Sequence, residues 1–112
     1  MTAKSNKNGG ETMETIKLDA DFFGNLKIEK LWRRFGNDGI VALIRFWCWC
    51  AKYQPDGDIA WMQEKDYEIA AGLHTTRIQP NWFWEMLDEL HFIEDTGEGY
   101  KLHDWKDFQG LE

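Results

Sequence analysis

The stretch PNWFWEMLDELHFIEDTGEGYKLH, residues 80–103, changes its hydrophobic period halfway and thereby decides the fold. Its first half has apolar side chains at the spacing of a helix with one buried face: Trp82, Phe83, Met86, Leu87 and Leu90. Pro80 suits the first turn of this helix because its missing N–H would be unpaired there. In the second half, β-like runs at 91–94 and 100–103 flank the turn sequence DTGEG, which predicts a β-hairpin.

Three more helices are predicted upstream of this stretch. The first follows Asn25 and ends at Gly36, a residue typical of helix C-termini, and its buried face is expected to hold Ile28, Leu31, Trp32 and Phe35. The second covers about residues 39–53, with Asp38 as its N-cap, and is apolar nearly all round. The third covers about residues 63–71 and offers three side chains for packing: Tyr67, Ile69 and Ala70.

A short strand completes the pattern. The turn sequence QPDG at 54–57 precedes residues 58–61, which we expect to form the third strand of a small sheet with the hairpin. The order is therefore helix, helix, strand, helix, helix, hairpin. A helical core whose last helix leads into a hairpin is the winged-helix variant of helix-turn-helix. The predicted fold class is mainly α (α+β), with about four helices and a small antiparallel β-sheet.

The composition fits one domain with its own core. The chain has 112 residues, of which 43% are hydrophobic and 15% aromatic. Cys48 and Cys50 lie in the second helix at a spacing that separates their side chains, so we expect two buried free thiols. Free thiols are typical of a reducing compartment, and the apolar run at 40–51 is too short to span a membrane. We therefore predict a cytoplasmic protein.

Both ends of the chain are expected to lie outside the domain. Residues 1–14 are polar, which predicts a flexible tail because they cannot bury enough surface to offset the entropy of ordering. The winged-helix domain is predicted for residues 15–110. Leu111 and Glu112 resemble the remnant of a cloning site before a tag, and on that interpretation the natural protein continues past Gly110.

The charge balance argues against DNA in the expected place. Thirteen basic and twenty acidic residues give a formal net charge of −7, whereas DNA-binding modules are usually basic. In DNA-binding relatives of this fold, the last helix enters the major groove. Here its outer face is expected to carry Trp84, Glu85, Asp88 and Glu89. The hairpin adds Glu94, Asp95 and Glu98.

The first helix offers a second nucleic-acid surface. Lys27, Lys30 and Arg34 follow one another at i, i+3 and i+7, and Arg33 lies beside this stripe. These four residues are the candidate contacts to DNA phosphates. An ordinary solvated helix face is the simpler interpretation of the same pattern.

The excess of aromatic residues favours a protein interface. The chain has seven Trp, and Trp84 is hard to place in the core from its position on the last helix. The second helix also has more apolar surface than one small domain readily covers. Because exposed aromatic surface usually marks an interface, Trp84, Trp49 and Trp61 are the candidate protein-binding residues.

Patterns for catalysis and metal binding are missing from the sequence. It contains no P-loop, dinucleotide-binding motif or nucleophile motif. His91 and His103 lie on facing runs of the predicted hairpin, but no cysteine pair or further ligand supports a metal site. We therefore expect no enzyme activity, no cofactor and no metal.

Two stretches resemble a known family. LDADFF at 18–23, followed by Lys27-Ile28, Leu31 and Phe35-Gly36, resembles the start of phage replisome-organiser N-terminal domains. YKLHDW at 100–105 resembles their end. These domains are similar to the N-terminal winged helix of DnaD-like primosome proteins.

The resemblance covers about residues 16–109, and the matching positions are structural. The segment 73–81 departs from the pattern because it is longer than a tight helix-turn-helix turn. The resemblance implies a role in phage or prophage DNA replication initiation. It also implies that the winged helix serves self-assembly, while a C-terminal region binds DNA and the helicase-loading machinery.

The leading hypothesis is therefore a winged-helix module that forms homo-oligomers or binds a replication protein, with weak nucleic-acid contact and no membrane contact. One alternative is a DNA-binding winged helix that uses the basic first helix. Another is a small phage transcriptional regulator or anti-repressor that docks a single protein.

Overall fold

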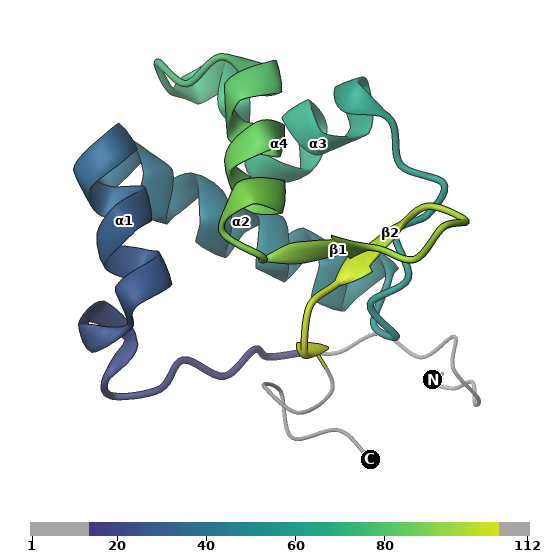
Figure 1. The fold of residues 1–112 in the computed structure, drawn as a ribbon, viewed down its shortest axis with the longest axis horizontal. Coiled ribbons are helices and arrows are strands. Elements are labelled where there is room, and N and C mark those ends of the chain that lie inside the picture. Colours follow the sequence, from purple (N-terminus) through teal and green to yellow (C-terminus); the bar gives the residue numbers. More distant parts are fainter. Residues whose placement is uncertain (1–13, 106–112) are drawn as a thin grey trace.

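The structure, a computed structural model, describes residues 14–105, where four α-helices precede a two-stranded antiparallel sheet (Figure 1). The elements are α1 (Leu26–Phe35), α2 (Asn37–Tyr53), α3 (Glu64–Ala71), α4 (Pro80–Glu89), β1 (Ile93–Asp95) and β2 (Tyr100–Leu102). Along the longest axis of the molecule, α1 lies at one end and the turn between β1 and β2 at the other. The predicted mainly helical, winged-helix-like class is confirmed.

α1 and α2 meet at a sharp corner. The side chain of Asn25 caps α1 by accepting a hydrogen bond from the backbone N–H of Lys27 at 2.8 Å. Gly36 ends α1 at φ +68°, a left-handed value that glycine adopts without strain, and α2 begins at the next residue. The prediction that Asp38 caps α2 was wrong, because Gly36 takes that position and Asp38 lies inside the first turn.

α2 forms the centre of the core but is not buried all round. Its buried side chains include Leu43, Phe46 and Cys50, each with no exposed surface. One strip along the helix remains exposed, as do Asn37 at its start and Tyr53 at its end; the strip holds Val41, Arg45, Cys48 and Lys52. The prediction of two buried thiols was therefore wrong for Cys48, which follows this strip, and right for Cys50. Burial raises the pKa of the Cys50 thiol.

α3 packs on α2, and α4 packs on α3 and reaches α2 through Phe83, whose ring centre lies 6.3 Å from that of Phe46; α3 and α4 form the helix-turn-helix. Gln63 and Asp66 close a reciprocal capping box at the start of α3, and Gly72 ends it at φ +64°. A short 3-10 turn, Leu73–Thr75, leads towards α4. Ile69 and Trp82 were expected to pack inside, but they are 59% and 55% exposed. Both lie just off the line of buried residues on their helix, where no neighbouring element covers them.

Trp32 on α1 differs from prediction in the same way. It was expected on the buried face with Leu31, but it is 49% exposed, and its indole N–H donates to Asn37 Oδ1 at 3.1 Å. Leu31 is fully buried. One residue along a helix turns the side chain by about 100°, which carries Trp32 past the edge of the core.

The hairpin pairs Ile93 with Leu102 and Asp95 with Tyr100 in antiparallel register. The predicted third strand is reduced to a single bridge, in which Asp58 lies opposite Lys101. Backbone hydrogen bonds hold it, with Leu102 N–H donating to Gly57 O at 2.8 Å and Ile59 N–H to Tyr100 O at 3.2 Å. The loop before α3 is thereby fixed to the wing.

The segments that flank the helices close one side of the core. A 3-10 turn, Phe22–Gly24, precedes α1 and buries Phe22. Trp105 folds back on the core as predicted, 3% exposed, and its indole N–H donates to Pro55 O at 2.8 Å. Predictions for residues 1–13 and 106–112, including the tail and the remnant of a cloning site, lie outside the described residues. None of the helices within residues 14–105 is long and apolar enough to cross a membrane.

Candidate interaction surfaces

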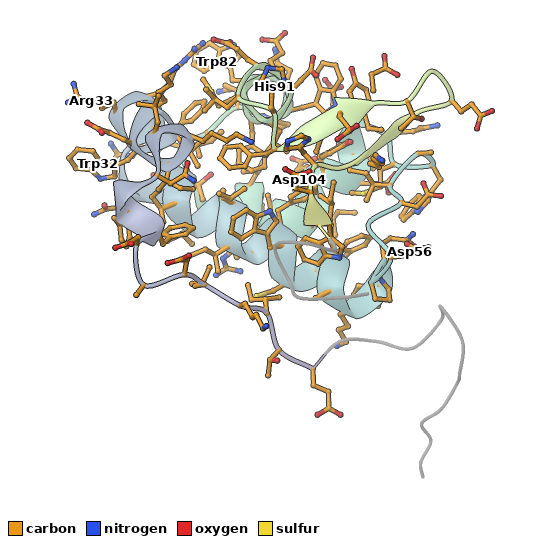
Figure 2. All side chains as sticks on the ribbon, turned by 60° about the horizontal axis from the view of Figure 1, so that its bottom comes forward. Trp32, Arg33, Asp56, Trp82, His91 and Asp104 are labelled. Carbon is orange, nitrogen blue, oxygen red and sulfur yellow. The ribbon has the colours of Figure 1, made fainter. Side chains whose placement is uncertain are left out.

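The outward face of α4 is acidic. The helix contains no Lys or Arg, and Glu85 and Glu89 are among its exposed residues, together with Trp82, which is labelled in Figure 2. Asp88 is half-buried on the same helix. In a DNA-binding helix-turn-helix this face would meet the phosphate-lined major groove. Here its three carboxylates disfavour phosphates: α4 has no cation of its own, and Arg34 of α1 lies 3.8 Å from Glu89 alone among them.

The wing is acidic too, and some of its carboxylates have partners. Glu94 Oε1 lies 2.7 Å from Nδ1 of His103, and Glu94 Oε2 lies 3.9 Å from Lys101 Nζ. The hydrogen bond with His103 holds the pKa of Glu94 below its ordinary value. Asp95 accepts the Gly97 N–H at 2.8 Å in the turn, and Glu98 is exposed at its tip.

The four predicted phosphate contacts on α1 are not equivalent. Lys27 points inward: its ammonium donates to His91 O at 2.9 Å and lies 5.4 Å from the centre of the Phe92 ring. Partial burial lowers the pKa of Lys27, although the charge of Asp104 opposes the shift. Lys27 therefore joins α1 to the end of α4 and is poorly placed to meet a phosphate.

The other three cations of α1 are exposed. Arg33 pairs with Glu29 on the same helix at 2.8 Å, and Arg34 lies 3.8 Å from Glu89 on α4. Exposed pairs of this kind contribute only about 0–1 kcal/mol, so they can be exchanged for other partners. Lys30 lies on the same helix and is also exposed. Figure 2 shows Trp32 and Arg33 projecting side by side from α1.

Two of the three predicted interface tryptophans are brought together. Trp49 on α2 lies 6.0 Å from Trp61, measured between ring centres, and 4.9 Å from Tyr53. Trp61 and Tyr53 are 50% and 53% exposed, and Trp49 is half-buried. We call Trp49, Tyr53 and Trp61 the aromatic cluster. Its chemistry, flat apolar rings next to the wing, suits a protein interface.

Trp84, the third predicted interface tryptophan, lies apart from the aromatic cluster. It was expected on the outer face of the last helix but is less exposed than that. It is half-buried and packs edge-on against Tyr100 of β2, with ring centres 5.5 Å apart. The wing packs over this side of α4. Trp84 therefore lies between the helix and the hairpin and does not face solvent fully. Trp82, two residues earlier, takes the exposed position instead.

A cavity of about 540 Å³ lies at the start of α1, and sequence reasoning missed it. Buried aromatic residues line its floor: Phe22, Trp47, Phe92 and Trp105. Polar groups also line it: Asp19, Asp21, Lys27, His103 and Asp104. This volume lies within the range of small-molecule sites, about 300–1,000 Å³. The lining residues come from segments far apart in the sequence, so no local pattern could have indicated it.

The histidines do not form a metal centre with one another. Among residues 14–105 no group of three or more His, Cys, Asp or Glu side chains is placed to hold a metal ion. His103 instead lies between Glu94 and Asp104, whose Oδ2 is 3.1 Å from its Nε2. Its position between two carboxylates stabilises the end of the hairpin.

Comparison with known proteins gave no family model and no solved structure that matches the chain.

Proposed function

We propose that this winged helix acts in the cytoplasm by binding proteins, in the first place other copies of itself, as a module of a replication-initiation assembly. The single observation that carries the proposal is the acidic face of α4 and the wing. In DNA-binding relatives of the fold this surface meets phosphates, and here it presents carboxylates without a cation on α4. The same fold can serve unrelated functions, so the surface chemistry decides.

The aromatic cluster supports a protein partner. Trp61 and Tyr53 expose about half of their surface beside the wing, and Trp and Tyr are enriched where proteins bind proteins. The replication setting rests on the resemblance of residues 18–36 and 100–105 to phage replisome organisers. It implies that other parts of such a protein contact DNA and the helicase-loading machinery.

Light scattering coupled to size-exclusion chromatography tests the proposal. We expect the mass to rise above the 13.3 kDa of one chain as protein concentration increases. Trp61→Ala should weaken association by about tenfold, because an aromatic anchor at an interface contributes on the order of 1.4 kcal/mol or more. Trp82→Ala is the matched control, since Trp82 is exposed to a similar extent on the outward face of α4. A mass of one chain at every concentration would contradict the proposal.

DNA binding by α1 is the second candidate, and the exposure of Lys30, Arg33 and Arg34 favours it. It predicts salt-dependent binding of a fluorescent duplex or single strand that weakens when these three residues are changed to Ala. Under the first proposal the labelled DNA shows no change in anisotropy at low salt.

A further inference from the structure

α1 gives one end of the molecule a positive charge. It carries four cations and one carboxylate in ten residues, and it lies at one extreme of the longest axis (Figure 1). Lys30, Trp32, Arg33 and Arg34 are all exposed there. We call these four residues the basic end. Its tryptophan is 49% exposed, so the basic end also offers an apolar contact.

The opposite extreme of the same axis is negative. There the wing and the loop before α3 lie next to each other (Figure 1), and Figure 2 places Asp56 away from α1. Four exposed carboxylates occur in these two segments, together with one exposed tryptophan: Asp56, Asp58, Asp95, Glu98 and Trp61. We call these five residues the acidic end; with the exposed Lys101, which lies opposite Asp58 on β2, this surface keeps a net charge of −3.

We propose that a second copy of this chain docks its basic end on the acidic end of the first, so that the domain assembles end to end. Each end pairs an exposed tryptophan with a net charge opposite to that of the other end. An end meeting its own counterpart would place like charges opposite each other, which disfavours a symmetric contact at either end. The proposal rests on the proposed function and specifies the geometry of its self-assembly.

The arrangement has two consequences. A contact between different surfaces of identical chains leaves a free end after each addition, so it gives open chains or closed rings of more than two copies. Its charges lie at the surface and are screened by salt, since the Debye length falls from about 10 Å at 0.1 M to about 3 Å at 1 M. The pairs Arg33–Glu29 and Arg34–Glu89 within one copy are exposed and weak. They therefore leave both arginines able to exchange these partners for carboxylates of a second copy.

Two double variants each change the charge of one end by three units. Lys30→Glu with Arg33→Gln neutralises the basic end, and glutamine keeps the ability to donate to Glu29. Asp95→Asn with Glu98→Lys changes the acidic end by an equal and opposite amount, and asparagine keeps the acceptor for the Gly97 N–H. Lys65→Glu with Arg77→Gln is the matched control, because both cations are exposed outside α1. Thermal unfolding checks that each variant remains folded.

Sedimentation velocity at low salt separates the outcomes. Wild type and the control should grow beyond two copies with concentration, and each end variant alone should associate at least about tenfold more weakly. A mixture of the two end variants should form complexes of one copy of each and stop there, because only one productive contact remains. Adding the basic-end variant to wild type should shorten the assemblies.

Wild-type assemblies that stop at two copies would overturn the end-to-end geometry. So would end variants that assemble like wild type, or a mixture that forms no paired complex; in these cases the proposed function stands and this inference fails. A wild-type protein that stays a single chain at every concentration refutes the proposed function itself, and the inference with it.

Discussion

α1 and α4 are amphipathic helices of ten residues each, and both bury one face in the same core, yet their exposed faces have opposite charges. α1 carries four cations, whereas α4 carries three carboxylates and no cation. Both buried faces pack in the same hydrophobic core, so both consist of apolar side chains. The exposed faces are free to differ, and in this molecule they reverse the charge that a DNA-reading winged helix would need on α4.

The inner and outer faces of α1 provide the largest expected contrast. Leu31→Ala should lower the free energy of unfolding by about 2–5 kcal/mol, because a fully buried leucine leaves a cavity. Trp32→Ala, one residue further and 49% exposed, should cost clearly less. Urea denaturation of both variants measures the difference. An equal loss of unfolding free energy in the two variants would mean that the outer face of α1 is also part of the core.

Gly99 lets the wing pack closely against the loop before α3. A Cβ at this position would lie 2.5 Å from Ala60 Cβ, and its φ of +135° strains any other residue. Gly99→Ala should therefore destabilise the protein by about 1–3 kcal/mol. Gly97→Ala is the control in the same turn: φ is also positive, but no atom lies within 4 Å of the added carbon. A larger fall in melting temperature for Gly97→Ala than for Gly99→Ala would show that the contact with Ala60 is unimportant.

Helix positions and the hairpin could be predicted from the sequence because their signals are local. Pro80, Gly36 and the turn DTGEG fix where helices and strands begin and end, and the hydrophobic spacing identifies most buried residues. Exposure at the edges could not be predicted in this way. Trp82 and Trp84 lie two residues apart, and only the path of the wing, which brings Tyr100 against Trp84, decides which of them is covered.

The candidate surfaces, too, could be predicted only where their signal lies within one segment of the sequence. The sequence alone shows that α4 and the wing are acidic. Its excess of aromatic residues also indicated Trp49 and Trp61 as candidate interface residues. Their contact with each other depends on the loop before α3 being fixed to β2. The inward turn of Lys27 towards His91 joins residues 64 positions apart, so spacing along α1 could not reveal it.

A weaker effect is expected where the two helices meet. Arg34 and Glu89 join α1 to α4 at 3.8 Å in an exposed position. A double-mutant cycle with Arg34→Ala and Glu89→Ala should give a coupling energy of about 0–1 kcal/mol. A coupling of several kcal/mol would mean that this pair locks the basic end, and it would count against exchange with a second copy.

The smallest expected effect is in the wing at acid pH. The pKa of Glu94 is below its ordinary value of 4.5 in the folded protein, so its ionised form contributes stability that is present above pH 4.5 and is lost as pH falls through the lowered value. Glu94→Gln should flatten this acid-side loss in urea denaturation at a series of pH values. Glu98→Gln on the same hairpin serves as the control. An unchanged pH profile for Glu94→Gln would exclude the interaction with His103 as its source.

We propose that this winged helix works through its opposite ends and not through DNA on α4. Sedimentation velocity of the wild-type chain at low salt, with a short fluorescent DNA duplex in the same cell, tests it directly. We expect the protein boundary to move faster as protein concentration rises, while the DNA boundary stays where it is without protein. A protein boundary that remains at one chain, with a DNA boundary that shifts as protein is added, would contradict it.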